Sequence, residues 1–439
     1  MKVLKFGGTS VGSAQRMKEV AKLITDGERK IVVLSAMSGT TNTLVEISDY
    51  LYKKNPEGAN EIINKLEAKY KQHVDELYAT EEYKQKGLEI VKSHFDYIRS
   101  YTKDLFTLFE EKVVLAQGEL ISTAMVNYYL QECGVKSVLL PALEYMRTDK
   151  NAEPDPIYIK DKLQAQLELY PDAEIYITQG FICRNAYGEI DNLQRGGSDY
   201  TASLIGAAIR ASEIQIWTDI DGMHNNDPRI VDKTAPVRQL HFEEAAELAY
   251  FGAKILHPTC IQPAKYANIP VRLLNTMDPL APGTLISNDT EKGKIKAVAA
   301  KDNITAIKIK SSRMLLAHGF LRKVFEIFES YQTSIDMICT SEVGVSVSVD
   351  NTKHLNEILD DLKKYGTVTV DKDMCIICVV GDLEWENVGF EAKALDAMRD
   401  IPVRMISFGG SNYNISFLIR ECDKKVALQS LSDMLFNGK

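Results

Sequence analysis

The chain has only two tryptophans, seven histidines and seven cysteines among its 439 residues. An odd number of cysteines scattered over a long chain is not a disulfide framework, so we expect reduced thiols and a cytoplasmic protein. The one Cys-x-x-Cys, from Cys375 to Cys378, lies in an apolar strand pattern, where positions i and i+3 face opposite ways. Buried thiols are expected there, rather than a redox or zinc site.

Long apolar runs and an excess of basic residues are also missing. No segment approaches the ~18 apolar residues that suggest a membrane span, and residues 1–8 lack the features of a secretory signal. The net charge is −9, whereas proteins that bind phosphate backbones or anionic lipid present basic surfaces. We therefore expect neither a nucleic-acid nor a membrane partner, although a small anionic ligand needs only local cations.

The common catalytic motifs are absent too. The sequence has no GxxxxGK[ST] loop and no GxGxxG, and neither a Ser-His-Asp arrangement nor a histidine-rich metal cluster emerges. What is present is an ordinary globular composition, 45% hydrophobic and 26% charged, over a length that suggests roughly three domains.

The first half of the chain has the pattern of an α/β protein. A strand at 1–6, a glycine-containing loop, a helix at 13–26 and a β-branched strand at 31–35 predict a parallel sheet. Residues 44–132 are helical in pattern, with a break at 55–58, and form a helical excursion from that sheet. The pattern predicts further strands at 135–140, 175–182, 214–217 and 271–274, and a helix at 242–252. A polar, hairpin-like stretch after 279–283 is expected to lead out of this domain.

From about residue 304 the pattern changes to short strands and helices that occur twice. The pairs Gly319-Phe320 and Gly389-Phe390 stand at matching places, 70 residues apart. Two βαββα units of this length form an internal repeat, which indicates stacked copies of one small module.

One stretch combines glycine with charge, at Arg195-Gly196-Gly197-Ser198-Asp199. It reads as a tight loop that feeds a helix, where close backbone approach and free N–H groups favour an anion. The plain alternative is a Gly-Gly turn in which Ser198 or Asp199 caps the helix.

Further polar loops follow other expected strands, and the carboxyl ends of parallel strands meet at one edge of a sheet. The chemistry-bearing residues of these loops are Lys5, Gly7, Gly8, Thr41, Thr218, Asp219 and Arg229. Paired glycines with lysines and aspartates suit phosphates and a divalent metal, so the residues favour a nucleotide-dependent kinase without a P-loop. Glu119 stands beside Gly118 at an expected helix start, where composition alone favours a plain first-turn partner of the helix dipole.

Six stretches, in order, resemble the signatures of aspartate kinases. They are Lys5-Phe6-Gly7-Gly8-Thr9-Ser10, Gly118-Glu119-Leu120, Gln179-Gly180-Phe181-Ile182, the stretch from Arg195 to Ala202, Trp217-Thr218-Asp219, and the stretch from Phe251 to Pro258. The resemblance covers essentially the whole chain and is nearest to the monofunctional, lysine-sensitive branch. It implies an α/β class: an amino-acid-kinase fold at 1–290, a mainly parallel sheet sandwiched by helices. Two ferredoxin-like βαββαβ ACT modules would follow, at 300–370 and 371–439.

The resemblance implies transfer of the ATP γ-phosphoryl group to the β-carboxylate of L-aspartate, with Mg²⁺, to give 4-phospho-L-aspartate. A carboxylate with a pKa near ~3.9 is ionised at neutral pH and needs no general base. Lys5 and Asp199 would be catalytic: Lys5 offsets charge on the phosphate, and Asp199 orients Lys5 or faces the metal. Another carboxylate or carbamate kinase of this fold, and a non-catalytic ACT sensor, are the alternatives.

By the same resemblance, Arg195 would hold the α-carboxylate of aspartate and Glu119 its α-ammonium. Thr41 and Ser198 would add hydrogen bonds, and Phe181 would pack against the substrate pocket, although a core position suits it nearly as well. The nucleotide residues would be Lys5, Gly7, Gly8, Thr218, Asp219, His224, Arg229 and Lys254. His224 stands where a tyrosine is common in the family, so it offers a ring contact but no phenol hydroxyl.

The first module resembles the lysine pocket of sensitive members, with lysine as the expected feedback inhibitor and threonine as the alternative. The matching residues are Met314, Gly319, Phe320, Leu321, Asp336, Thr340, Ser341 and Glu342. Asp336 and Glu342 would pair with the two amino groups of lysine, and backbone N–H groups near Gly319 would take its carboxylate. A set of turn, core and cap residues is the plain alternative, and Ala317 stands where some relatives have serine. ACT modules usually pair between subunits, which implies a homodimer or larger assembly; whether their strands interleave stays open.

Overall fold

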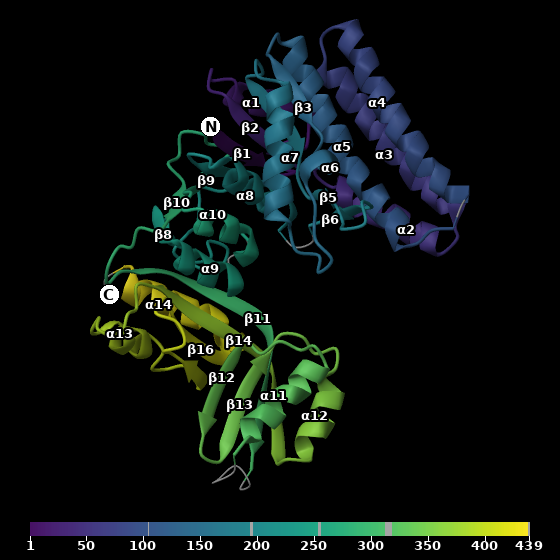
Figure 1. Ribbon diagram of the computed structural model, residues 1–439. Helices are drawn as coiled ribbons and strands as arrows, with labels where there is room; N and C mark the ends of the chain where they lie inside the picture. Colours follow the sequence, from purple (N-terminus) through teal and green to yellow (C-terminus); the bar gives the residue numbers. More distant parts are fainter. Residues whose placement is uncertain (104, 194–195, 253–255, 312–317, 438–439) are drawn as a thin grey trace. The chain divides into compact units, whose positions relative to one another are not determined.

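The computed structural model describes residues 1–103, 105–193, 196–252, 256–311 and 318–437 (Figure 1). The chain forms two compact units. The first comprises Met1–Met223 and Leu256–Asn288, and the second comprises His224–Ile255 and Asp289–Lys439.

The first unit is built on a mainly parallel sheet. Its strands are β1 (Lys2–Phe6), β2 (Lys30–Leu34), β3 (Ser137–Leu140), β4 (Ile175–Gln179), β7 (Ile214–Thr218), β9 (Val271–Asn275) and β10 (Thr284–Ser287). They lie in the order β3-β4-β2-β1-β7-β9-β10, and every pair is parallel except β9 with β10. All five residues of β2 are buried, as its continuous β-branched run predicts for a strand covered on both faces.

Helices cover both faces of this sheet. One core joins strand residues to α1 (Ala14–Ile24), α2 (Thr40–Tyr52), α3 (Pro56–Leu77), α4 (Glu81–Ser100) and α5 (Leu108–Glu132). The remaining helices of the unit are η1 (Tyr101–Lys103), α6 (Ala142–Tyr145), α7 (Pro156–Leu169), α8 (Gly197–Ile209), η2 (Pro258–Ile261) and α10 (Gln262–Tyr266). Of these, α8 contacts β1, β2 and β7 directly.

The helical excursion is confirmed, including its break. Helix α2 ends at Tyr52, and α3 begins at Pro56 because Asn55 caps it by accepting a hydrogen bond from Gly58 N at 2.9 Å. Figure 1 shows α2, α3, α4 and α5 lying side by side as a bundle. Helix α7 and the hairpin of β5 (Ile182–Arg184) and β6 (Ile190–Asn192) were not predicted from the sequence.

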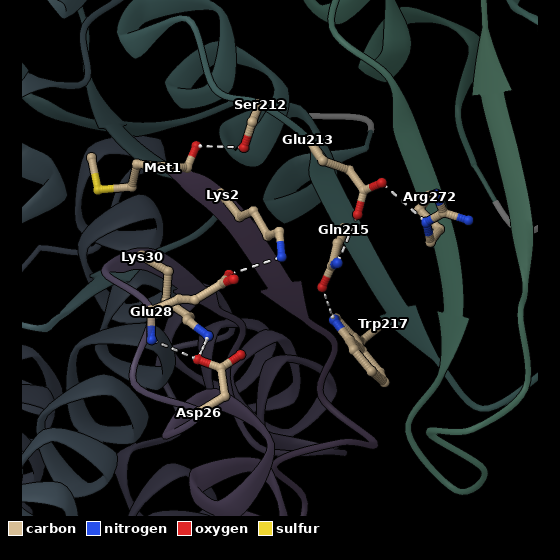
Figure 2. Close-up of polar contacts among 10 residues, drawn as sticks. All are labelled: Met1, Lys2, Asp26, Glu28, Lys30, Ser212, Glu213, Gln215, Trp217 and Arg272. Atoms are coloured by element: carbon tan, nitrogen blue, oxygen red, sulfur yellow. Dashed lines mark hydrogen bonds and ion pairs between the residues drawn. The ribbon is translucent and has the colours of Figure 1, made fainter.

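The amino ends of the parallel strands are closed by polar contacts (Figure 2). Lys2 Nζ donates to Glu28 Oε2 at 2.8 Å, and Arg272 Nε donates to Glu213 Oε2 at 3.0 Å. The buried ammonium of Lys30 pairs with Asp26. The site residues described below gather at the opposite, carboxyl end of the strands.

The second unit contains a six-stranded antiparallel sheet in the order β12-β13-β11-β14-β16-β15. Its strands are β11 (Ile295–Lys310), β12 (Met337–Ser341), β13 (Gly344–Val349), β14 (Thr367–Gly381), β15 (Val403–Ser407) and β16 (Asn414–Arg420). The helices are α11 (Phe320–Ser330), α12 (Leu355–Lys363), α13 (Phe390–Ala397), η4 (Glu421–Asp423) and α14 (Lys424–Leu435). The unit also contains β8 (Gln239–His241) and α9 (Phe242–Tyr250).

Two long strands belong to both repeats. Residues 304–310 of β11 pair with 367–374 of β14, and residues 295–301 pair with 376–381. The modules are therefore interleaved through β11 and β14, which lie side by side in Figure 1. The polar, hairpin-like stretch expected after 279–283 contains β10, which pairs antiparallel with β9. The change of pattern expected from about residue 304 comes earlier, because β11 starts at Ile295.

The internal repeat is confirmed in detail. Gly319 and Gly389 are the N-caps of α11 and α13, and both have left-handed backbones, with φ of 83° and 92°. Cys375 and Cys378 are both buried in β14, as their apolar strand pattern predicts. All seven cysteines are free.

Residues 224–252 are anchored to both repeats rather than standing apart from them. Val231 joins the core of the second repeat, and the Asn226 side chain donates to Leu428 O at 3.0 Å. At the other end of the segment, the Tyr250 hydroxyl donates to Asp336 Oδ1 of the first repeat at 2.8 Å. Helix α9 is therefore held at its end by the first module.

Among the helices of the described ranges, none has both the length and the apolar character needed to cross a membrane.

Candidate active site

A lysine and an aspartate pair at the carboxyl end of β1. Lys5 Nζ lies 2.8 Å from Asp199 Oδ1, which the first turn of α8 presents. The two side chains are only 12% and 16% exposed, so solvent screens their attraction weakly. A Cβ atom at Gly7 would lie 3.4 Å from Lys5 Nζ, so the glycine loop after β1 runs alongside the ammonium.

The start of α8 differs from the expected cap. The N-cap is Gly196, whose φ of 81° is left-handed, and neither Ser198 nor Asp199 caps the helix. The physical reason is that glycine adopts this backbone conformation at no steric cost. The Asp199 side chain is thereby available to pair with Lys5.

Ser198 is held by the loops that follow two strands. The Ser35 hydroxyl, after β2, donates to Ser198 Oγ at 2.8 Å. A Cβ atom at Gly180, after β4, would lie 2.3 Å from Ser198 Oγ, so no larger residue fits there. The carboxyl ends of β2 and β4 and the start of α8 therefore meet at this serine.

Phe181 has a positive φ of 68°, which is uncommon for a bulky residue. Its N–H donates to Thr201 Oγ1 at 3.0 Å, and its carbonyl accepts from Leu193 N at 2.8 Å. Its ring packs against Gly197, where an added Cβ would lie 2.9 Å from Phe181 Cδ2. Phe181 therefore supports the Gly-Gly turn, and such strained backbones concentrate at functional sites.

Glu119 is a buried carboxylate, and one of its oxygens has no hydrogen-bond partner among the described residues. It is 3% exposed; Oε1 accepts from Ala36 N at 3.2 Å, whereas Oε2 has no partner within the described ranges. Burial raises the pKa of Glu119 to about 7. The expected helix start at this residue is wrong: α5 begins at Leu108, where Thr107 and Glu110 form a capping box.

Adjacent residues after β2 connect Glu119 to the Lys5–Asp199 pair. Ser35 reaches Ser198, the neighbour of Asp199, while Ala36 N donates to Glu119. The site thus offers one ammonium with its carboxylate partner and, close by, a second carboxylate for which the described part of the chain provides no cation. Such a site suits a ligand that carries both an ammonium and an anionic group.

Thr41 lies partly exposed in the first turn of α2. Its neighbour Thr40 is buried, and the hydroxyls of Thr40 and Tyr70 lie 2.9 Å apart. Tyr70 comes from α3, so the helical excursion holds the start of α2. The sequence analysis missed Tyr70, because nothing distinguishes one tyrosine in a helix rich in lysine and glutamate.

Thr218 and Asp219 follow β7 in the first unit. The Thr218 hydroxyl accepts from Ile220 N at 3.3 Å within a local turn, and Asp219 is exposed. A Cβ atom at Gly8 would lie 2.9 Å from Ala36 O, so the glycine allows the loops after β1 and β2 to approach. The backbones of these two loops therefore lie close together, and the first of them runs beside Lys5.

Two predicted nucleotide residues belong to the second unit. His224 Nδ1 lies 2.9 Å from Thr234 Oγ1, and Arg229 forms a bidentate pair with Asp227 at 2.9 and 2.7 Å. The guanidinium of Arg229 is exposed. Arg195, Lys254 and Met314, three further predicted site residues, lie outside the described residues.

The predicted effector residues lie at the start of α11 and at the two ends of β12. Gly319 caps α11, Phe320 begins it, and Leu321 follows exposed, whereas Thr340, Ser341 and Glu342 are exposed at the end of β12 and Asp336 precedes its first residue. Asp336 differs from these, because its side chain is only 1% exposed and its Oδ1 already accepts from Lys301 Nζ at 2.7 Å. Burial raises the pKa of Asp336 although Lys301 opposes that rise.

The donor set around Lys5 suits a metal that arrives with a nucleotide. No three of the described histidine, cysteine, aspartate and glutamate side chains cluster as metal ligands. Mg²⁺ commonly keeps its waters and binds through one or two carboxylates and the substrate phosphates. Asp199, the carboxylate paired with Lys5, could serve as such a ligand for Mg²⁺ bound to the phosphates.

Comparison with known proteins agrees with this arrangement. Residues 1–275 match the amino acid kinase family, and residues 377–435 match an ACT domain. Aspartokinase 1 of Arabidopsis thaliana chloroplasts is 36% identical over 465 residues, covering 99% of this chain and 80% of that protein. The chain belongs to the aspartokinase family.

Solved structures extend the likeness of this aspartokinase to the fold. Aspartokinase III of Escherichia coli in complex with aspartate and ADP, its R-state, has a TM-score of 0.85 at 31% identity, and covers 99% of this chain and 100% of its own. The same enzyme in complex with lysine and aspartate, its T-state, has a TM-score of 0.81 at 32% identity over 99% of both chains. The predicted fold, a parallel-sheet kinase domain followed by ACT modules, is thereby confirmed.

Proposed function

We propose that this aspartokinase transfers the γ-phosphoryl group of ATP to the β-carboxylate of L-aspartate and is inhibited by lysine. The observation that carries the proposal is Glu119: a buried carboxylate with an unpartnered oxygen, linked through Ser35 and Ala36 to the Lys5–Asp199 pair. Family membership and the aspartate and ADP bound to the Escherichia coli relative support the choice of substrates.

In this proposal, Glu119 pairs with the α-ammonium of aspartate. Thr41 and Ser198 donate hydrogen bonds to the substrate, Arg195 holds its α-carboxylate, and Phe181 keeps the Gly-Gly turn in place. The β-carboxylate is ionised at neutral pH and attacks without a general base. The protein therefore contributes alignment and charge neutralisation rather than proton transfer.

Lys5 neutralises negative charge that develops on the transferring phosphoryl group. Asp199 holds the Lys5 ammonium at 2.8 Å, so the lysine is already oriented when the phosphate arrives. Gly7 and Gly8 let the backbone approach the phosphates, and Thr218, Asp219, His224, Arg229 and Lys254 hold the nucleotide. Mg²⁺ bound with ATP would supply further charge neutralisation at the phosphates, near Asp199.

Lysine would bind the first ACT module through Asp336, Glu342 and the backbone near Gly319, flanked by Met314, Phe320, Leu321, Thr340 and Ser341. The lysine complex of the Escherichia coli relative supports this effector. Thr340→Ile or Glu342→Ala should then relieve lysine inhibition and leave the uninhibited rate unchanged. Inhibition by threonine with no response to lysine would exclude this choice of effector.

We also propose a homodimer or larger assembly through the ACT modules. Exposed apolar residues recur at equivalent places of the repeat, Phe325 of α11 with Leu395 of α13 and Ile338 of β12 with Ile406 of β15. Recurring exposed apolar groups are typical of an interface. Sedimentation velocity tests the assembly. A cytoplasmic location belongs to the same proposal, because all seven cysteines are free thiols.

The decisive experiment is a coupled ADP-release assay with aspartate, with glutamate and without an amino acid, each with and without lysine. We expect activity with aspartate only, reduced by lysine. Activity with glutamate but not aspartate would indicate another carboxylate kinase of this fold. No activity with any acceptor would favour an amino-acid sensor.

A further inference from the structure

The second unit contains an ammonium group surrounded by acidic and aromatic side chains, which we call the Lys301 cage. Lys301 Nζ lies 2.7 Å from Asp336 Oδ1 and 2.9 Å from Asp350 Oδ2. It also lies 4.4 Å from the centre of the Tyr250 ring. Two carboxylates and one aromatic face are the groups by which proteins bind a primary ammonium.

The cage is not saturated by its resident lysine. Two carboxylates face one ammonium, so one negative charge is left over. Asp336 Oδ2 has no hydrogen-bond partner within the described ranges, although its side chain is only 1% exposed. The Lys301 side chain is 18% exposed and comes from β11, while Asp336 precedes β12. Solvent therefore reaches the lysine more readily than the carboxylate behind it.

The resident group is chemically the same as the side-chain ammonium of free lysine. We propose that Lys301 is a built-in competitor for the effector: its ammonium occupies Asp336 Oδ1 while Oδ2 is buried behind it, so a free amino-acid ammonium must displace Lys301 to reach this carboxylate. This inference rests on the proposed lysine site at Asp336. It adds that the affinity for lysine is set by an internal competition rather than by the pocket alone.

The competition also involves helix α9. The hydroxyl of Tyr250, the last residue of α9, donates to Asp336 Oδ1 at 2.8 Å, the same oxygen that Lys301 contacts. A ligand that takes this oxygen competes with both groups. A ligand that displaces both groups therefore also releases the end of α9 from the first module, a differential contact of the kind that couples two sites.

The test is lysine inhibition and lysine binding in the full-length Lys301→Met variant, each compared with the wild-type enzyme. Removal of a competitor increases the fraction of binding-competent sites, so apparent affinity rises by the same factor. We expect the lysine concentration for half-inhibition, relative to the variant's own uninhibited rate, to fall about fivefold or more. Damage to the pocket would change it in the opposite direction, so the sign of the effect identifies its cause.

A matched control is Lys424→Met. Lys424 Nζ pairs with Asp302 Oδ2 at 2.6 Å in the same unit, and its side chain is 21% exposed, close to the value for Lys301. This variant should keep the half-inhibition concentration within about twofold, since it loses a comparable ion pair away from Asp336. Lys301→Arg, which keeps a cation in the cage, should likewise stay near wild type. Lys301→Gln is the second variant should Lys301→Met fail to fold.

Calorimetric titration with lysine separates this inference from the proposed function. Binding that tightens in Lys301→Met and not in Lys424→Met supports the competitor, even if wild-type binding is too weak to measure. Unchanged or weaker binding in Lys301→Met overturns the competitor and leaves the lysine site intact. Absence of lysine binding in the wild-type enzyme and in Lys301→Met overturns the competitor and the lysine site together. An ADP-release assay that responds to aspartate would still support the proposed kinase activity.

Discussion

Two buried carboxylates, one in each unit, have opposite surroundings. From the residues that the structure describes, Glu119 receives the backbone N–H of Ala36 and no cation. Asp336 is equally withdrawn from solvent, but it holds the Lys301 ammonium and the Tyr250 hydroxyl. The comparison shows that burial alone does not define a binding site: what matters is whether the chain itself supplies the partner.

A buried carboxylate without a cation is costly, since burial disfavours its charged form. Glu119 accepts that cost, and its pKa rises to about 7. We interpret this as preparation for an ammonium that arrives with the substrate. Lys301 offsets part of this cost at Asp336, although burial still raises the pKa of Asp336, so an arriving ammonium meets competition there. A buried carboxylate can thus bind an arriving ammonium directly in the first unit, whereas in the second unit a resident lysine already occupies it.

The largest expected effect comes from the cation that faces the phosphates. Lys5→Ala removes the ammonium and leaves Asp199 unpaired, so kcat should fall by about 10²–10³-fold, the usual effect of losing one transition-state stabiliser. The fold should persist, as checked by circular dichroism. A near-normal kcat would exclude the role given to Lys5.

The second largest expected effect comes from Glu119, the carboxylate proposed to bind the α-ammonium of aspartate. Glu119→Gln keeps the shape of the side chain but loses the charge, so the KM for aspartate should rise about 10–100-fold, as for a lost charged hydrogen bond. The KM for ATP serves as the internal control and should change little. If both KM values rose together, Glu119 would have a structural role instead.

The pH dependence of the reaction tests the same carboxylate. Only ionised Glu119 attracts an ammonium, and its pKa is raised to about 7 by burial. In the wild-type enzyme, kcat/KM for aspartate should therefore fall about tenfold per pH unit below pH 7 and level off above it. In Glu119→Gln this limb should be absent; its persistence would assign the titration to another group.

The stability of the two carboxylate variants should move in opposite directions. The folded-state pKa of Glu119 lies above the usual 4.5, so wild-type stability falls as pH rises from about 4.5 to 7 and stays reduced above that range. Glu119→Gln should therefore be as stable as wild type or more stable at pH 8. Burial also raises the pKa of Asp336, but Asp336→Asn in addition leaves the part-buried Lys301 ammonium, whose pKa is raised, with Asp350 alone. The variant should therefore lose about 1–3 kcal/mol at pH 8. Urea denaturation at pH 8 measures the free energy of unfolding of both variants relative to the wild type. If both variants were destabilised, the proposed difference between the two carboxylates would be wrong.

The smallest expected effect concerns the paired hydroxyls of Thr40 and Tyr70, at the start of α2. Tyr70→Phe leaves the buried Thr40 hydroxyl without its partner, so the start of α2 loosens, and the KM for aspartate should rise about threefold. Tyr78→Phe is the matched control, because it removes another buried hydrogen bond of α3's end, to Met125 O at 2.8 Å. Equal KM values in the two variants would show that the pair has no part in binding.

Much of the fold is predictable from the sequence, because its signals are local. The β-branched run of β2, the Asn55-Pro56 break and the repeated Gly319 and Gly389 each specify nearby backbone. Only the part of β11 after residue 304 and the part of β14 around Cys375–Cys378 were predicted as strand. The remaining parts are identified by pairing with residues far away in the sequence, such as Ile295 with Gly381. The expected start of a helix at Glu119 was wrong, because the Thr107 capping box begins α5 earlier.

The site was predictable in its residue types rather than in its contacts. The six motifs brought Lys5, Glu119 and Asp199 to attention, and the structure brings Lys5 and Asp199 together. The Gly196 cap and the partners of Asp336 were missed. Lys301 and Tyr250 reach Asp336 from distant parts of the chain, and such contacts leave no local signal.

The most direct test of the comparison is a crystal structure of the enzyme with aspartate and a non-hydrolysable ATP analogue. The decisive quantity is the distance between the α-ammonium nitrogen of aspartate and Glu119 Oε2. Our account predicts a charge-assisted hydrogen bond, at about 2.7–2.9 Å. An aspartate bound with its ammonium elsewhere, and Glu119 Oε2 still without a partner, would contradict it.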